Sequence, residues 1–292
     1  MSAPARGAAP GAPPAPPAAR GPRRPRGRAR LLVVLVLAAV WVFPLYWMVV
    51  TALSSRADLA TGRVGLVPTG VDLSAFRRVL VDFPLLQWVS NSAAIAVVAV
   101  VLTVVVDVLA GYVLAKHRFP GRSVVFFCIV ATLMIPVQTL LVPQFDLVND
   151  LGWINSYWAV IVPRSAEAFG VFLARQYFLS LPDELIEAAQ LDGAGQLRTL
   201  VSIVLPLARP LVAVLVVMTF VYRWNEFAWP LVALREPALY TLPVGLSFLQ
   251  SQYSTDYPAL MAGALISALP VLVLFGLAQR QFVAGLARSG LR

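Results

Sequence analysis

A polar connection between two hydrophobic segments carries the sequence EAAQLDG at residues 187–193, and IVLP follows at residues 203–206. The residues around it predict a short helix over 181–192. Ser180 and Asp183 have the spacing of a capping box, and Gly193 stands where a left-handed residue would end the helix. In a chain otherwise rich in hydrophobic residues, a short acidic helix of this kind indicates a surface that binds a partner protein.

The predicted helix has two distinct faces. At 100° per residue, Leu181, Leu185, Ala188 and Ala189 share one face, and Glu187 lies on the opposite, acidic face. Helices that rest on a lipid surface are normally rich in Lys and Arg on their polar face. We therefore expect this helix to contact a protein through Glu187 rather than a membrane surface.

The composition is typical of an all-α, polytopic membrane protein. Of the 292 residues, 59% are hydrophobic and only 13% are charged, whereas soluble domains contain roughly 25% charged residues. The net charge is +9, but seven of the 23 Lys and Arg residues lie in the first thirty positions and most others lie between apolar segments. This distribution indicates a positive-inside bias and no nucleic-acid partner. The single cysteine, Cys128, excludes a disulfide framework within the chain.

A membrane-spanning helix needs about 20 mostly apolar residues. The segments that meet this requirement are 31–51, 89–115, 123–145, 156–178, 203–223 and 258–279, which predicts six transmembrane helices. The preceding residues, 1–30, are mainly Ala, Pro, Gly and Arg, and we expect a disordered cytoplasmic tail there. The tail is followed by one transmembrane domain over residues 31–292. A cleaved signal peptide is the competing interpretation, but the uncharged stretch that follows is longer than its apolar core of about 7–15 residues.

The charges between the segments predict that both termini are cytoplasmic. Basic residues gather in the tail, in 116–122 and at the carboxyl terminus, whereas the connection 146–155 contains two aspartates and no base. Cytoplasmic loops carry the excess of Lys and Arg. The connection 52–88 contains four arginines and departs from the pattern, which long loops follow less strictly.

The tryptophans fit the same topology. All except Trp41 fall near predicted outer ends of helices, as in an aromatic belt at a membrane interface. Stacking on the face of a sugar is a second interpretation for Trp224 and Trp229.

The spacing EAA-x3-G-x9-I-x-L-P resembles the cytoplasmic loop of the inner-membrane permease subunits of ABC importers, and this sequence matches it at every position. From about residue 31 to the end, the chain is similar to the carbohydrate-type branch, which includes the maltose and glycerol-phosphate importers. The supporting stretches are FPLYWM at 43–48, RFPGR at 118–122, MIP at 134–136, FGVFLARQ at 169–176, WNEF at 224–227 and QRQFV at 279–283.

This resemblance implies a permease of the cell membrane whose loop docks on a cytoplasmic ATPase. The residues that it assigns to this coupling are Glu187, Ala188, Ala189, Asp192, Gly193, Leu205 and Pro206. It also implies a second, homologous permease subunit, two ATPase subunits, an extracytoplasmic solute-binding protein and a carbohydrate substrate in the lipid bilayer. The chain itself is not expected to be an enzyme or to hold a cofactor. Lys116 is its only lysine and follows no phosphate-binding glycine-rich loop, so ATP and Mg²⁺ belong to the partner ATPase.

Charged residues inside predicted helices mark candidates for the translocation path, because charges in a bilayer are costly. Asp107 precedes Lys116 by nine residues, which places it roughly 13 Å from the cytoplasmic end of the helix. Arg164 and Glu167 lie at a similar depth and are close enough along a helix to pair. Our hypothesis is that these three residues line or gate the path; a structural ion pair that fixes helix packing is the alternative.

A second polar cluster, Arg223, Asn225 and Glu226, lies at the outer end of the fifth predicted helix. It is a candidate for contact with the substrate or the solute-binding protein. The alternative is an ordinary hydrated helix end.

Other functions remain open at this point. The same importer architecture can carry a peptide or an amino acid. A secondary transporter driven by an ion gradient is the rival of another class, with Asp107 and Glu167 as coupling carboxylates. A membrane enzyme ranks below both, because the sequence offers no acid–base or metal-binding pattern at a suitable spacing.

Overall fold

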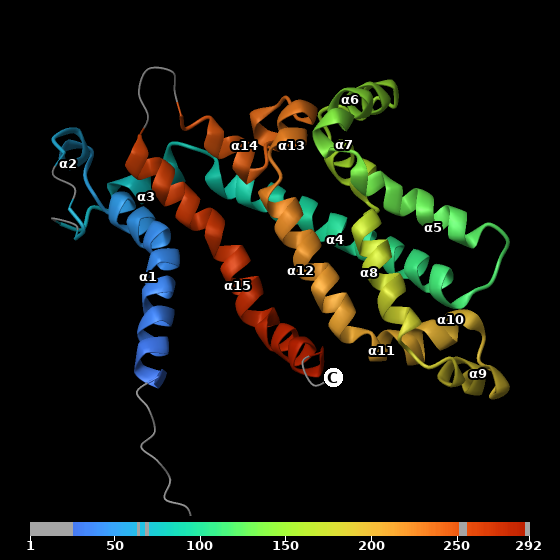
Figure 1. Cartoon of the computed structure of the whole chain (residues 1–292). Coiled ribbons are helices and arrows are strands. Elements are labelled where there is room, and N and C mark those ends of the chain that lie inside the picture. Colours follow the sequence, from blue (N-terminus) through green and yellow to red (C-terminus); the bar gives the residue numbers. More distant parts are fainter. Residues whose placement is uncertain (1–25, 63–64, 68–69, 251–255, 290–292) are drawn as a thin grey trace, which may run out of the picture. The chain divides into compact units, whose positions relative to one another are not determined.

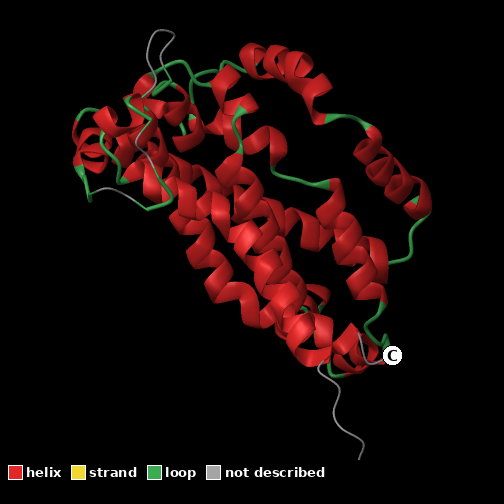
Figure 2. Ribbon diagram, turned by 60° about the vertical axis from the view of Figure 1, so that its left-hand side comes forward, coloured by secondary structure: helices red, strands yellow, loops and turns green. Residues whose placement is uncertain are grey.

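A computed structural model describes residues 26–62, 65–67, 70–250 and 256–289, with only the backbone described at 26–29, 278 and 280–289. Its described elements are all helices (Figure 2). Residues 1–25 of the predicted tail lie outside the described residues. The chain divides into two units, Met1–Pro44 and Leu45–Arg292, which are described separately below.

The described part of the first unit is the beginning of α1 (Arg26–Ala52). Its apolar side chains are exposed, and Trp41 has 80% of its surface accessible. Pro44 lies inside this helix without ending it. The uncharged, apolar composition from Leu31 onward suits a helix that is surrounded by lipid.

The second unit contains the end of α1 and all later helices (Figure 1). In chain order these are α2 (Arg56–Ala60), α3 (Ser74–Val81), α4 (Leu85–Lys116), α5 (Arg122–Ala131), η1 (Thr132–Met134), η2 (Val137–Leu140), α6 (Leu141–Asp150), α7 (Tyr157–Ile161), η3 (Val162–Arg164), α8 (Ala168–Leu179), α9 (Glu184–Leu191), α10 (Gln196–Thr199), η4 (Leu200–Val204), α11 (Leu205–Leu207), α12 (Arg209–Asn225), α13 (Ala228–Ala233), η5 (Pro237–Leu239), α14 (Leu242–Ser247) and α15 (Tyr257–Ser289).

Helix α4 is the centre of the second unit and packs most extensively against α8 and α12. The core between these three helices includes Val104, Tyr112, Phe178 and Leu215. Gly111 brings α4 and α8 into close contact. A Cβ atom at this position would lie 2.5 Å from the Ala174 Cβ and 2.9 Å from the backbone nitrogen of Arg175. The α4–α8 pair therefore has no room for a side chain at this crossing.

Three described helices are long and apolar enough to cross a membrane. They are Arg30–Ala52, Leu85–Lys116 and Tyr257–Leu277, and they overlap the predicted segments 31–51, 89–115 and 258–279. The number of candidate membrane spans is up to five when each of two sharply bent helix pairs is counted as one span.

The other three predicted segments are not continuous helices. Segment 123–145 bends by 98° between Arg122–Met134 and Val137–Asp150, and segment 203–223 lies within a pair that bends by 81° between Gln196–Leu207 and Arg209–Asn225. Segment 156–178 comprises α7, η3 and α8, with a non-helical stretch at 165–167. The expectation of one unbroken helix is wrong at each of these places.

Proline contributes to two of these interruptions, because it lacks a backbone N–H and can disfavour a helical residue before it. Ile135, which precedes Pro136, is extended with ψ of 118°. Pro163 cannot donate to the carbonyl of Ala159, and this oxygen instead accepts a hydrogen bond of 2.9 Å from the indole of Trp229. A side chain from α13 thus satisfies the carbonyl that Pro163 leaves free in α7.

Three tryptophans have a different role from the one predicted. Trp88, Trp224 and Trp229 are 4%, 1% and 0% exposed, and their indole N–H groups donate to the carbonyls of Pro237, Ser267 and Ala159. A buried indole with a satisfied N–H is a core residue. The aromatic-belt interpretation is therefore wrong for these three residues, and the sugar-stacking interpretation is wrong for Trp224 and Trp229.

Candidate functional site

The acidic segment forms α9, which begins at Glu184 rather than at 181. The predicted serine cap is wrong, because the Ser180 hydroxyl donates to the Tyr177 carbonyl at the end of α8. The predicted end is confirmed: Gly193 has φ of +80°, and the N–H of Ala194 donates to the carbonyl of Ala189. A glycine in this conformation terminates the helix without the steric cost that other residues would have.

Helix α9 is exposed on most of its surface. Ala189 is buried, and Ile186 packs against the α4–α8–α12 core. Glu187 and Ala188 are exposed, and Leu185 is 43% exposed. The inward face is centred on Ile186 and Ala189, so Leu185 and Ala188 lie on the exposed side together with Glu187. The outer face combines a carboxylate with exposed aliphatic side chains.

Lys116 fixes the start of this helix to the end of α4. Its ammonium group donates to the carbonyl of Leu181 at 2.6 Å and to the carboxylate of Asp183 at 2.5 Å. The hydrogen bond from this ammonium group holds the pKa of Asp183 below its ordinary value. The only lysine of the chain thus joins the long central helix to the acidic segment.

The segments that carry EAAQLDG (187–193) and IVLP (203–206) contact the same core. Residues 203–206 continue from η4, a π-helix, into α11. Leu205 packs against the core that also receives Ile186, whereas Pro206 and Asp192 are exposed. Single-turn π-helical insertions frequently occur at functional sites. The fold therefore places 187–193 and 203–206 at one end of the α4–α8–α12 group (Figure 1).

Asp107 fixes the break before α8. It is 1% exposed, and its carboxylate accepts a hydrogen bond of 2.9 Å from the backbone N–H of Glu167. The Thr103 hydroxyl donates to the carbonyl of Arg164 at 3.4 Å. Gly170 lies directly against the Asp107 carboxylate and leaves no space for a side chain. The non-helical backbone at 165–167 thereby obtains partners from α4, as buried backbone requires.

The two predicted polar clusters form one network. Arg164 pairs with Glu226 at 2.5 Å, and Arg223 pairs with Glu167 at 3.1 Å and with Glu226 at 3.4 Å. Arg223 also donates to the carbonyl of Arg164. The predicted Arg164–Glu167 pair is wrong, because the break after η3 removes the helical spacing on which it depended. Arg223 is 5% exposed, so the interpretation of a hydrated helix end is also wrong for it.

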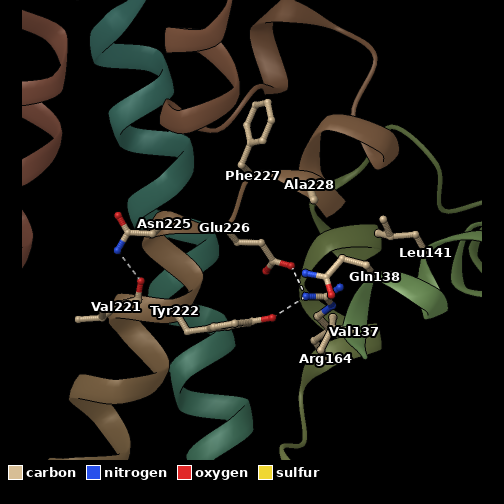
Figure 3. Close-up of a pocket in the computed structure, with 10 residues that line it drawn as sticks. All are labelled: Val137, Gln138, Leu141, Arg164, Val221, Tyr222, Asn225, Glu226, Phe227 and Ala228. Atoms are coloured by element: carbon tan, nitrogen blue, oxygen red, sulfur yellow. Dashed lines mark hydrogen bonds and ion pairs between the residues drawn. The ribbon is translucent and has the colours of Figure 1, made fainter. Parts of the chain in front are cut away.

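Two pockets lie beside this network. One has a volume of about 400 Å³ and is lined by Asp107, Glu167 and Tyr222 among other residues. The second, of about 370 Å³, is lined by Arg164, Tyr222, Asn225 and Glu226 and by apolar residues (Figure 3). Tyr222 borders both pockets. The Asn225 amide donates to the carbonyl of Val221 at 2.7 Å and takes no part in the ion pairs described above.

Sequence reasoning missed two residues that organise the site: Tyr222, which lines both pockets, and Lys116, which anchors α9. It named Arg223 but did not place it at the centre of the network. Arg223 carried a signal, since it is a charged residue at the outer end of a predicted membrane-spanning helix. Nothing in the sequence pairs it with Glu167. Within the described ranges, no cluster of three or more His, Cys, Asp or Glu side chains is arranged to hold a metal ion.

Comparisons with known proteins agree with this architecture. Residues 107–287 match the family described as binding-protein-dependent transport system inner membrane component. The arabinooligosaccharides transport system permease protein AraQ of Halalkalibacterium halodurans is 36% identical over 259 residues, which are 88% of this chain and 93% of that protein. The lactose transport system permease protein LacG of Rhizobium radiobacter is 36% identical over 248 residues, covering 85% and 90% of the two chains.

A glycerol-phosphate permease and a solved structure extend the similarity. The sn-glycerol-3-phosphate transport system permease protein UgpE of Escherichia coli O1:K1 is 32% identical over 259 residues, or 86% of this chain and 92% of its own. A chain of a bacterial ABC transporter involved in the import of the acidic polysaccharide alginate superposes with a TM-score of 0.80 at 27% identity, covering 91% of this chain and 99% of that one. The helical fold, the matched family and these relatives lead to one conclusion: this chain belongs to the binding-protein-dependent transport system inner membrane components, the permease subunits of ABC importers.

Proposed function

We propose that this chain is a transmembrane permease subunit that imports a sugar, an oligosaccharide or a polyol by alternating access. The relatives support the cargo class, since they are named as transport proteins for arabinooligosaccharides, lactose and glycerol phosphate. A homologous permease subunit completes the pore, a solute-binding protein delivers the cargo from outside, and two ATPase subunits supply the energy. ATP and Mg²⁺ are held by the ATPase, so this subunit is not an enzyme.

In this proposal the chain crosses the cell membrane six times, with residues 1–30 as a cytoplasmic tail and 31–292 as the permease domain. The three long apolar helices and the two bent pairs account for five crossings, and α7 with α8 supplies the sixth. Both termini are then cytoplasmic. The basic residues of 116–122, next to the end of α4, support a cytoplasmic position for that end and for α9.

The exposed helix α9 carries the coupling function, and this is the observation on which the proposal depends most. Glu187 and Ala188 face outward, Gly193 ends the helix, and Leu205 with Pro206 connects it to α12. Lys116 transmits a displacement of α9 to α4 through its bonds at 2.6 Å and 2.5 Å. Closure of the ATPase moves the helix, and the α4–α8–α12 group moves with it.

The charged network forms the translocation path, at a distance from α9 along the α4–α8–α12 group. Asp107, Arg164, Glu167 and Glu226 join α4, the α7–α8 break and the end of α12, and Asn225 lies at the rim. Because ion pairs join these elements next to two helix interruptions, a change in the angle of α4 alters the pockets beside them. The tightly packed core below moves as a rigid body.

Capture of the ATPase tests this function. The tagged full chain is purified with candidate ATPases, and Glu187→Lys and Gly193→Asp are compared with matched controls. Asp146→Lys makes a similar charge reversal on exposed α6, and Gly195→Asp adds the same charge where φ is −68° and nothing lies within 4 Å.

We expect both controls to retain the ATPase and both test variants to lose it. The charge reversal removes the carboxylate through which α9 is expected to contact its partner, and an aspartate with φ of +80° strains the end of α9. If both test variants capture the ATPase as well as the wild type does, the coupling function of this helix is refuted.

A further inference from the structure

Three helix interruptions meet at the pocket of about 370 Å³. Val137 and Gln138 follow the bend after α5, Arg164 ends η3, and Glu226 with Phe227 separates α12 from α13. At membrane depth, irregular backbone is tolerated where it is buried in protein or lines a cavity that holds water or substrate. Discontinuous helices also build the substrate sites of other transporter folds. The convergence of three breaks at one pocket therefore indicates a site for a polar solute.

Two side chains in this pocket have hydrogen-bonding capacity to offer. Among the described residues, the amide of Gln138 has no hydrogen-bond partner, and its group can both donate and accept. The Tyr222 hydroxyl accepts a bond of 2.9 Å from Arg164, so its own proton remains available to a ligand. Figure 3 shows Tyr222 directed toward Arg164, with Gln138 projecting from the same side of the pocket as Arg164. A sugar hydroxyl, which is both donor and acceptor, matches both groups.

The lining of this pocket carries no net charge. Its charged residues are Arg164 and Glu226, which pair at 2.5 Å with side chains only 12% and 6% exposed. Glu226 is further bound by Arg223 at 3.4 Å. A carboxylate or phosphate on the cargo would find its only cation already neutralised, and separating a buried pair is costly. The remaining walls, including Leu141 and Ala228, are apolar and suit the carbon face of a sugar ring.

We propose that this pocket is a transit subsite for an uncharged carbohydrate, in which Gln138 and Tyr222 bind hydroxyl groups of the cargo. The inference rests on the proposed function and narrows its cargo class to uncharged carbohydrates. It favours cargo such as the neutral sugars named for AraQ and LacG over the anionic cargo named for UgpE or for the alginate importer. The Arg164–Glu226 pair then positions the Tyr222 hydroxyl and excludes anions.

The test uses the complete importer in proteoliposomes, with arabinotriose and lactose as uncharged probes and an alginate trisaccharide as the acidic probe. The variants Gln138→Leu and Tyr222→Phe each remove one hydrogen-bonding group with little change in size. Gln144→Leu is the matched control, because it makes the same substitution on α6 at a residue that does not line this pocket. ATP hydrolysis stimulated by the solute-binding protein is measured beside uptake.

We expect each test variant to lower uptake of the neutral probe carried by the wild type about tenfold, the loss of roughly one hydrogen bond. ATP hydrolysis should stay within about twofold of the wild type, because α9 and its contacts are unchanged. The control should transport normally. This separation of uptake from hydrolysis distinguishes a cargo contact from general damage to the fold.

Three results would overturn the subsite. Normal uptake by both test variants would remove Gln138 and Tyr222 from the path and leave the proposed function intact. Uptake of the alginate trisaccharide by the wild type at the rate of the neutral probes would refute the preference for uncharged cargo. If the wild type carries no carbohydrate at all with ATP, the proposed function and the subsite both fail.

Discussion

The substitution Gly111→Ala tests the close packing that joins the coupling end of this subunit to its path. The added Cβ would lie 2.5 Å from the Ala174 Cβ, although ordinary contacts begin at 3.4 Å, and 2.9 Å from a backbone nitrogen. One helix must therefore shift by about 0.9 Å, or distort. Overpacking of this kind costs about 1–3 kcal/mol, which exceeds the gain of up to about 1 kcal/mol from replacing glycine within a helix.

With the full gain subtracted, the net loss reaches about 2 kcal/mol, which corresponds to a melting temperature lower by up to about 4–8 °C for a chain of this size. The assay is thermal unfolding of the full chain in detergent micelles, followed by tryptophan fluorescence. Gly276→Ala is the control, because it lies in α15 and nothing surrounds its Cβ position within 4 Å; its melting temperature should be unchanged or slightly higher. A Gly111→Ala variant that melts at or above the wild type would refute the close α4–α8 contact.

Three further predictions concern the charged contacts. Lys116→Met removes the bonds to Leu181 and Asp183, so amide hydrogen exchange at 181–187 should accelerate about tenfold; unchanged exchange would contradict the anchoring. Asp107→Asn keeps an acceptor for the Glu167 N–H but loses the charge, and we expect uptake to fall at least about fivefold with the melting temperature nearly unchanged; normal uptake with weakened assembly would assign a structural role. Burial raises the pKa of Asp256, but hydrogen bonds from Arg56 and Arg78 outweigh it and lower the pKa below 3.8. Its stabilisation is therefore present at neutral pH and is lost as the pH falls through that lowered value. Protection factors of the amides in α2 and α3, which correct the exchange rate for its intrinsic pH dependence, should fall between about pH 6 and about pH 3 in the wild type but not in Asp256→Asn.

The sequence predicted the helical class and the end of the acidic helix because these depend on local chemistry. The length of the uninterrupted hydrophobic stretch is enough to locate the helix Leu85–Lys116. Gly193 has the left-handed backbone that is expected of a glycine at the end of a helix. Hydrophobicity does not distinguish a continuous span from an interrupted one. Pro136 and Pro163 mark true breaks, whereas Pro44 and Pro270 lie inside continuous helices. At Pro163 the freed carbonyl of Ala159 is satisfied by the indole of Trp229, which comes from a distant part of the chain.

The network was beyond sequence reasoning because its partners are distant in the chain. Arg164 and Glu226, or Arg223 and Glu167, come together only when α12 packs beside the break between η3 and α8. Spacing suggested Arg164 with Glu167, which is a sound pairing for an unbroken helix and fails here. In the same way, the position of a tryptophan at a helix end does not reveal whether its ring faces lipid or the core.

The energy source of transport tests the central claim most directly. The wild-type chain is reconstituted in proteoliposomes with its partner permease, ATPase and solute-binding protein, and uptake of a labelled neutral oligosaccharide is measured. Either ATP on the cytoplasmic side or an imposed proton or sodium gradient is supplied. The account predicts uptake that requires ATP and persists when the gradients are collapsed. Uptake that follows an ion gradient without ATP would contradict it, and Asp107 and Glu167 would then become candidate coupling carboxylates.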